Sequence, residues 1–199
     1  FQAEDGIRDC LLSRGLGDVY KRQLTDMYYI DDLMFLPAPC DEPIIENCSN
    51  VVQDYNIISD WNCQQNYGIE TTVPSVLNPL ISCDNRSEYV GQYTDDGTEA
   101  YDAFILNYGS IINLNTHNKL KFKLYSSSSI QVLAKLEGGS AIEKWSDFSA
   151  VNTWQEFSYD FSDSIDNENT TLVLFFNAGQ NNGNPEDIYH IDELRWEEN

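Results

Sequence analysis

Apolar and polar residues alternate along much of the chain, which is the pattern of β-strands with one face in a core. The clearest case is the segment 119–124, where three lysines alternate with Leu120, Phe122 and Leu124. We expect these three apolar side chains to face the core and the lysines to face water. The same alternation, or a continuous apolar run typical of a central strand, marks the strands expected at 51–56, 89–93, 103–108, 130–136, 154–161, 172–176 and 187–196.

The last of these strands contains a break in its alternation. Tyr189 and Ile191 share one parity, whereas Leu194 and Trp196 share the other. A slip of one residue predicts a β-bulge, or a strand that passes from one sheet to another. Because about nine short strands follow one another without a helical period, the predicted fold class is all-β: an antiparallel β-sandwich of the jelly-roll type.

The sequence of this strand occurs twice. Residues 26–33 match residues 187–194 at their Asp, Tyr, Ile, Asp and Leu positions, at an offset of 161 residues, which is about the length of one domain. We therefore expect residues 24–36 to be the last strand of a truncated preceding repeat. Three prolines make 37–44 a stiff linker, and 45–198 is the expected jelly-roll domain.

The first 23 residues do not fit this pattern. They resemble a conceptual translation of a short-read sequencing adapter, and their glycines interrupt any helix without a strand period replacing it. We treat residues 1–23 as a non-native, disordered segment, with a genuine flexible leader as the alternative. In this interpretation the true N-terminus and any signal peptide lie upstream.

The chain is strongly acidic, and this limits its partners. The net charge of −22 is unchanged without the first 23 residues, because they carry four basic and four acidic side chains. Such a charge repels nucleic acid and anionic membrane surfaces, and no apolar run approaches the roughly 20 residues of a membrane helix. We expect a soluble protein with neither partner. An acidic surface also suits divalent cations.

Four cysteines remain beyond the leader, and their spacing is not that of a zinc site. An even number in an acidic β-rich chain favours two disulfides and an oxidising compartment, with buried free thiols as the alternative. Of the three possible connectivities we expect Cys63–Cys83 and Cys40–Cys48.

Several motifs resemble galactose-binding-like jelly-roll domains of secreted Bacteroidota proteins. These motifs are Val90-Gly91-Gln92-Tyr93, Lys135-Leu136-Glu137-Gly138-Gly139, the segment from Thr153 to Phe161, and Tyr189-His190-Ile191-Asp192-Glu193-Leu194. The resemblance covers roughly residues 45–198 and specifies the fold better than the ligand. Many such domains are carbohydrate-binding modules attached to polysaccharide-degrading enzymes. Trp154 matches a structural position of the family.

The resemblance also implies a structural calcium ion between the first and last strands. Asp54 and Asp192 are the matching residues, and Ca²⁺ takes oxygen ligands of this kind. Relatives often carry Phe-Glu after the Asp, whereas this chain has Tyr55-Asn56. The alternative is that Asp192 only hydrogen-bonds the bulged backbone.

For sugar binding, the expected chemistry is an aromatic ring stacked on a pyranose face with amides and carboxylates around it. We expect Trp145 and Tyr101 to stack, Asn177 and Asn181 to donate hydrogen bonds, and Trp61 to be a reserve. Packing in the core is the competing interpretation for each aromatic residue.

The predicted function is therefore a non-catalytic carbohydrate-binding module, extracellular or at the cell surface, within a larger multidomain chain and monomeric. Neutral glycans are favoured because the acidic surface opposes anionic ones. No catalytic triad, nucleophile elbow or phosphate loop is present. The alternative function is a structural or adhesive tandem repeat without a sugar site.

Overall fold

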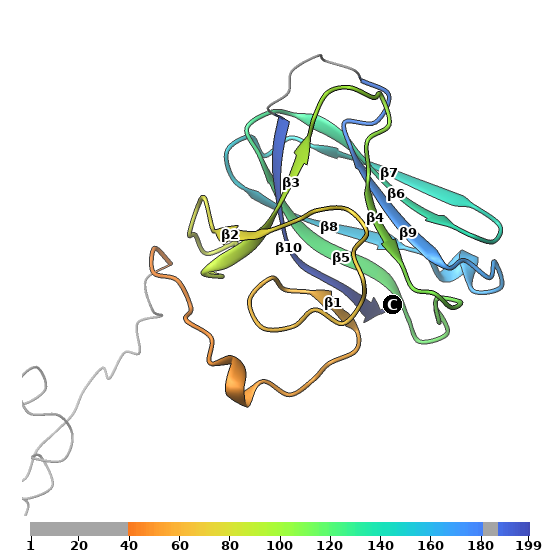
Figure 1. The fold of residues 1–199 in the computed structure, drawn as a ribbon, viewed down its shortest axis with the longest axis horizontal. Coiled ribbons are helices and arrows are strands. Elements are labelled where there is room, and N and C mark those ends of the chain that lie inside the picture. Colours follow the sequence, from red (N-terminus) through yellow and green to blue (C-terminus); the bar gives the residue numbers. More distant parts are fainter. Residues whose placement is uncertain (1–39, 181–186) are drawn as a thin grey trace, which may run out of the picture. The chain divides into compact units, whose positions relative to one another are not determined.

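Two antiparallel sheets face each other in the structure, as the alternating pattern predicts (Figure 1). The computed structural model describes residues 40–180 and 187–199, so the predictions for 1–23 and 24–36 lie outside the described residues. The six-stranded sheet has the order β2-β3-β10-β5-β8, with β1 also paired to β10, and the four-stranded sheet has the order β4-β9-β6-β7. The strands are β1 (Ile57–Ser59), β2 (Ser75–Leu77), β3 (Tyr89–Asp95), β4 (Phe104–Asn107), β5 (His117–Ser126), β6 (Ile130–Glu137), β7 (Ile142–Phe148), β8 (Trp154–Asp160), β9 (Thr171–Phe176) and β10 (Asp187–Glu198), and two 3₁₀ turns lie at Cys48–Asn50 and Ser162–Ser164.

The core lies between the sheets and follows the predicted parity. Leu120, Phe122 and Leu124 of β5 are fully buried, and the lysines between them point outward, so that prediction is confirmed. β9 pairs with both β4 and β6, which confirms 172–176 as a central strand. The strand expected at 51–56 is wrong: Val52 is 86% exposed and the first strand, β1, begins only at Ile57.

The break in the alternation of β10 is a β-bulge. Asp192 lies opposite Lys123 and Arg195 lies opposite Lys121, so β10 uses one more residue than β5 over this stretch. Glu193, within the bulge, has a φ of 50°, in the left-handed region that is uncommon for residues other than glycine. The bulge keeps β10 in one sheet while both Ile191 and Leu194 remain buried.

The segment before β1 is mostly exposed and is held to the sandwich by two disulfides. They are Cys40–Cys83 and Cys48–Cys63, so the expected pairing is wrong. Loop-closure entropy favours neighbours in the sequence only weakly, and here the segment runs beside the loop before β3, where the Ile44 N–H donates to the Arg86 carbonyl at 2.7 Å. Residues 40–44 of the expected linker are thus bonded to the domain.

The helical turns within the described ranges are all too short to cross a bilayer.

Candidate functional site

The outer face of the four-stranded sheet carries a row of apolar side chains that crosses the strands. Leu133 in β6 lies opposite Trp145 in β7 on one side and opposite Phe175 in β9 on the other. These positions point away from the core, because their neighbours along the strands, such as Val132 and Phe176, are buried in it. Trp145 is 48% exposed and Leu133 only 4%, as expected for a smaller side chain between two larger ones.

Tyr101 extends this row beyond Phe175. The two rings meet edge to face with centroids 6.5 Å apart, and Tyr101 is 69% exposed. Its loop is fixed by the loop after β9, where the Gly179 N–H donates to the Ala100 carbonyl at 2.7 Å. Gly179 has a φ of +79° and lies against the Tyr101 ring. We call Trp145, Leu133, Phe175 and Tyr101 the aromatic row.

Polar side chains border the aromatic row on both sides. Two residues further along the same strands, Gln131 lies opposite Asp147, and its amide donates to that carboxylate at 3.3 Å. On the other side Lys135 lies opposite Glu143 and pairs with it at 3.3 Å, and with Glu137 at 2.7 Å. The apolar strip thus has hydrogen-bond donors and acceptors on both edges over β6 and β7, whereas on β9 the position opposite Lys135 is the apolar Val173.

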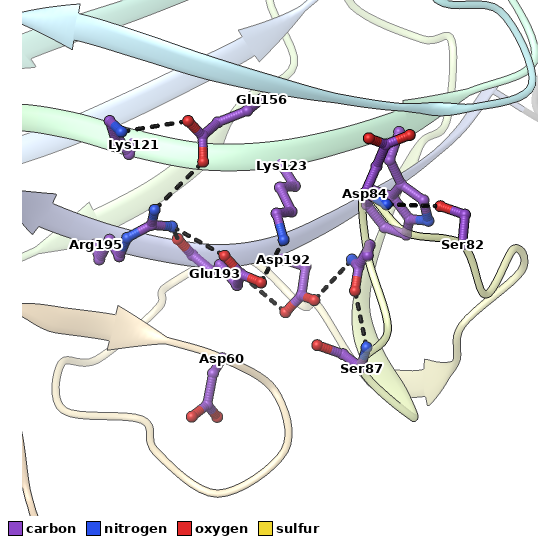
Figure 2. Close-up of polar contacts among 12 residues, drawn as sticks. Asp60, Ser82, Asp84, Ser87, Lys121, Lys123, Glu156, Asp192, Glu193 and Arg195 are labelled. Carbon is purple, nitrogen blue, oxygen red and sulfur yellow. Dashed lines mark hydrogen bonds and ion pairs between the residues drawn. The ribbon is translucent and has the colours of Figure 1, made fainter. Parts of the chain in front are cut away.

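The outer face of the six-stranded sheet has a different character. A network of ion pairs covers the centre of this face. Its lysine and arginine side chains lie within ion-pair distance of glutamates, as Figure 2 shows for part of the network. Further along this face the Trp154 indole is only 4% exposed, because its N–H donates to the Leu80 carbonyl of an overlying loop. The network consists of Lys121, Lys123, Arg195, Glu156, Glu193 and Glu197. This face also carries an aromatic row, His190, Tyr125 and Trp154 on adjacent strands, but its rings are less exposed than Trp145 and Tyr101.

Three carboxylates gather next to Tyr101. One oxygen from each of Asp95, Asp96 and Asp102 lies within 4.8 Å of the others, so this acidic cluster could hold a metal ion. Burial, and then the negative charges of Asp96 and Asp95, raise the pKa of Asp102. Its Oδ2 is buried and accepts a hydrogen bond from no donor among the described residues. Carboxylate oxygens held this way suit a hard cation such as Ca²⁺.

The expected metal ligands Asp54 and Asp192 lie elsewhere and have other partners. Asp192 is fully buried, and its two oxygens accept from the Asn85 amide and the Glu193 N–H, both at 2.8 Å (Figure 2). Burial raises the pKa of Asp192 to about 7, against the hydrogen bonds that lower it. Asp54 is exposed and accepts from the Asn56 N–H. Neither belongs to a cluster of three metal-ligating side chains in the described part of the chain, and calcium at this pair stays a prediction.

The expected sugar-binding residues divide into three groups. Trp145 and Tyr101 are brought to one face, and the Asn177 N–H beside them donates to the Gln131 carbonyl at 2.8 Å. Asn181 lies outside the described residues. Trp61 is a correction, because its ring is 8% exposed and packs in the core, which leaves it no face for a sugar.

Sequence reasoning missed the centre of the row. Phe175 lies in a run of apolar residues, so the sequence does not indicate which of these side chains point out of the core. Leu133 shares that difficulty, because both of its neighbours along β6 are buried. The acidic cluster had a weak signal, since Asp95 and Asp96 are adjacent at the end of β3 whereas Asp102 follows six residues later.

Comparison with known proteins supports the fold. No known protein family and no curated protein sequence matches the chain. An exo-β-agarase structure is similar with a TM-score of 0.52 at 11% identity, over 72% of this chain and 24% of that enzyme. SGBP-B from a xyloglucan utilization locus in Bacteroides uniformis (TM-score 0.48, 12% identity, 73% of this chain and 50% of that one) is similar too. The family 11 carbohydrate-binding module of Lic26A-Cel5E from Clostridium thermocellum is similar with a TM-score of 0.47 at 12% identity, over 72% of this chain and 94% of that module. At 11% identity the likeness to the exo-β-agarase structure shows the fold alone.

Proposed function

We propose that this chain is a non-catalytic carbohydrate-binding module and that its sugar site is the aromatic row. The observation that carries the proposal is the alignment of the exposed Trp145, the half-buried Phe175 and the exposed loop residue Tyr101 on one face of the sandwich, with polar groups beside them. A pyranose has apolar C–H faces and polar edges, so a ring face fits the row while its hydroxyls meet the borders.

The negative charge of the protein favours neutral glycans over anionic ones as its ligands. The chain carries a net charge of −22, and Asp147, Glu137 and Glu143 lie on the borders of the row. Uronic or sulfated chains would be repelled at this face. Affinity is modest, because an open face buries little area, and attachment to a larger protein supplies effective concentration.

Calcium is part of the proposal, at a different place from the one that the sequence suggested. Asp95, Asp96 and Asp102 supply carboxylate oxygens within reach of one ion, and the buried, unpartnered Oδ2 of Asp102 supports a cation there. A bound Ca²⁺ would neutralise the cluster and hold the loop that carries Tyr101. Thermal melts with and without Ca²⁺ test this: the proposed site requires a higher melting temperature with calcium and no such gain in Asp102→Asn.

The setting of the module is also proposed. Two disulfides fit a secreted or cell-surface protein. The second copy of the β10 motif at 26–33 supports a chain in which another module precedes this one.

Affinity electrophoresis of the full chain against a panel of neutral and anionic polysaccharides tests the sugar site. We expect at least one neutral polysaccharide to retard the wild type and to lose this effect with Trp145→Ala. Tyr55→Ala is the matched control, because Tyr55 is 72% exposed but lies outside the sheets. No retardation by any polysaccharide would favour the tandem structural repeat instead, and retention of binding in Trp145→Ala would place the site elsewhere.

A further inference from the structure

The centre of the aromatic row differs from its ends. Trp145 and Tyr101 each carry a polar atom, the indole N–H and the phenol hydroxyl, whereas Leu133 and Phe175 carry none. Leu133 is nearly covered, so the half-buried Phe175 supplies most of the exposed surface at the centre. A hydroxyl pressed onto this part of the row finds no hydrogen-bond partner.

The direction of the row determines how a glycan lies on it. Trp145, Leu133 and Phe175 come from three adjacent strands, so the row crosses the strands instead of following one. Adjacent strands are about 4.8 Å apart, and an extended β-1,4-linked chain advances by little more than one such spacing per sugar. Two spacings of about 4.8 Å and the 6.5 Å from Phe175 to Tyr101 therefore accommodate about three sugars.

An extended β-1,4-linked chain also turns over at each residue. Alternate sugars present opposite ring faces to the protein, and opposite edges to each border. Mixed donors and acceptors on both borders suit this alternation: Gln131 and Asp147 on one side, Lys135 and Glu143 on the other. A sugar with one axial hydroxyl directs it at the row at every second residue. On a row of about three sugars, such a chain therefore places an axial hydroxyl either at the centre or at both ends, where it disturbs stacking on Trp145 and Tyr101.

We infer that Phe175 is a specificity-determining residue, which selects β-1,4-linked chains whose hydroxyls are all equatorial, such as glucans, over chains with an axial hydroxyl, such as mannans. The inference rests on the proposed function and adds the configuration of the sugar. An axial hydroxyl at the centre of the row loses its bonds to water and gains none. Leaving a polar group unpaired in this way weakens binding by about tenfold or more.

Isothermal titration calorimetry of the full chain with cellotetraose and mannotetraose tests the inference. We expect the wild type to bind cellotetraose about tenfold more tightly or better. Phe175→Gln places a donor and an acceptor at the centre and should narrow the ratio, whereas the matched Phe175→Leu keeps the surface apolar and should preserve it. Both replacements are at a half-buried outward position, and thermal melts establish that each variant is folded.

The outcomes separate the inference from the function on which it rests. Equal binding of the two oligosaccharides, or an unchanged ratio in Phe175→Gln, overturns the role of Phe175 and leaves a carbohydrate-binding module. The role of Phe175 is also overturned if neither oligosaccharide binds while another polysaccharide retards the protein in affinity electrophoresis. Failure of every glycan removes the proposed function itself. Affinity for longer cello-oligosaccharides should level off beyond about three sugars, the length that strand spacing gives the row.

Discussion

Asp192 should make the fold less stable as the pH rises. Its side chain is fully buried at the bulge of β10, with the Asn85 amide and the Glu193 N–H as partners. Burial raises its pKa from 3.8 to about 7. Between these values the folded chain keeps a proton that the unfolded chain has lost, so the stability that this proton contributes is present below pH 4 and disappears as the pH passes 7.

The size of the effect follows from the same two values. A difference of about three pH units, at about 1.36 kcal/mol each, corresponds to about 4 kcal/mol of unfolding free energy. The slope approaches about 1.4 kcal/mol per pH unit between pH 4.5 and 6.5. Other carboxylates of this acidic chain add a background slope, so the contribution of Asp192 is the difference between the wild type and a variant without the ionisable group.

Urea denaturation at a series of pH values, with a chelator present, measures this difference. Asp192→Asn should have a flatter dependence on pH than the wild type, whatever its stability at any single pH. Asp54→Asn is the control, because it removes an exposed carboxylate from the turn before β1 instead of a buried one. Equal slopes in the wild type and Asp192→Asn would refute the reasoning, because they would mean that the buried carboxyl titrates as an exposed one does.

Three further predictions concern stability. Replacing Cys48 and Cys63 together by serine opens a loop of 15 residues and should lower the unfolding free energy by about 3 kcal/mol in denaturant titrations, and an unchanged midpoint would contradict this. Gly91→Ala would place a Cβ 2.3 Å from the buried Trp61 ring, so its melting temperature should fall by several degrees, and a wild-type melt would show that the ring can move aside. Trp145→Ala removes a half-exposed ring outside the core and should change the melting temperature little, so a large loss would mean that the ring is needed for folding.

The sequence predicts the sandwich well where one face of a strand is polar. The lysines of β5 mark its outward parity, and the slip between Ile191 and Leu194 marks the bulge. The first strand was misplaced because Val51 and Val52 have a high strand propensity but no partner strand. Propensity alone does not supply the pairing on which a strand depends.

The candidate site was predicted at its ends and missed at its centre. Trp145 and Tyr101 stand out in the sequence because polar residues surround them. Phe175 does not, because β9 is apolar on both faces and its outward parity depends on which strands flank it. Trp61 has the same polar surroundings in sequence as Trp145, yet it lies over Gly91, a contact that depends on how the early loop folds back.

The disulfide between Cys40 and Cys83 has a mechanical consequence. A chain that joins this domain to a neighbour transmits tension through residue 40, and the covalent bond passes that tension directly to Cys83. The segment 41–82, including β1 and β2, lies outside the loaded path while the bond is intact. Force therefore enters the sandwich just before β3, which is paired to the central strand β10. Reduction of this one bond would reroute the load through residues 41–48, the Cys48–Cys63 disulfide and residues 63–82 before it reaches Cys83.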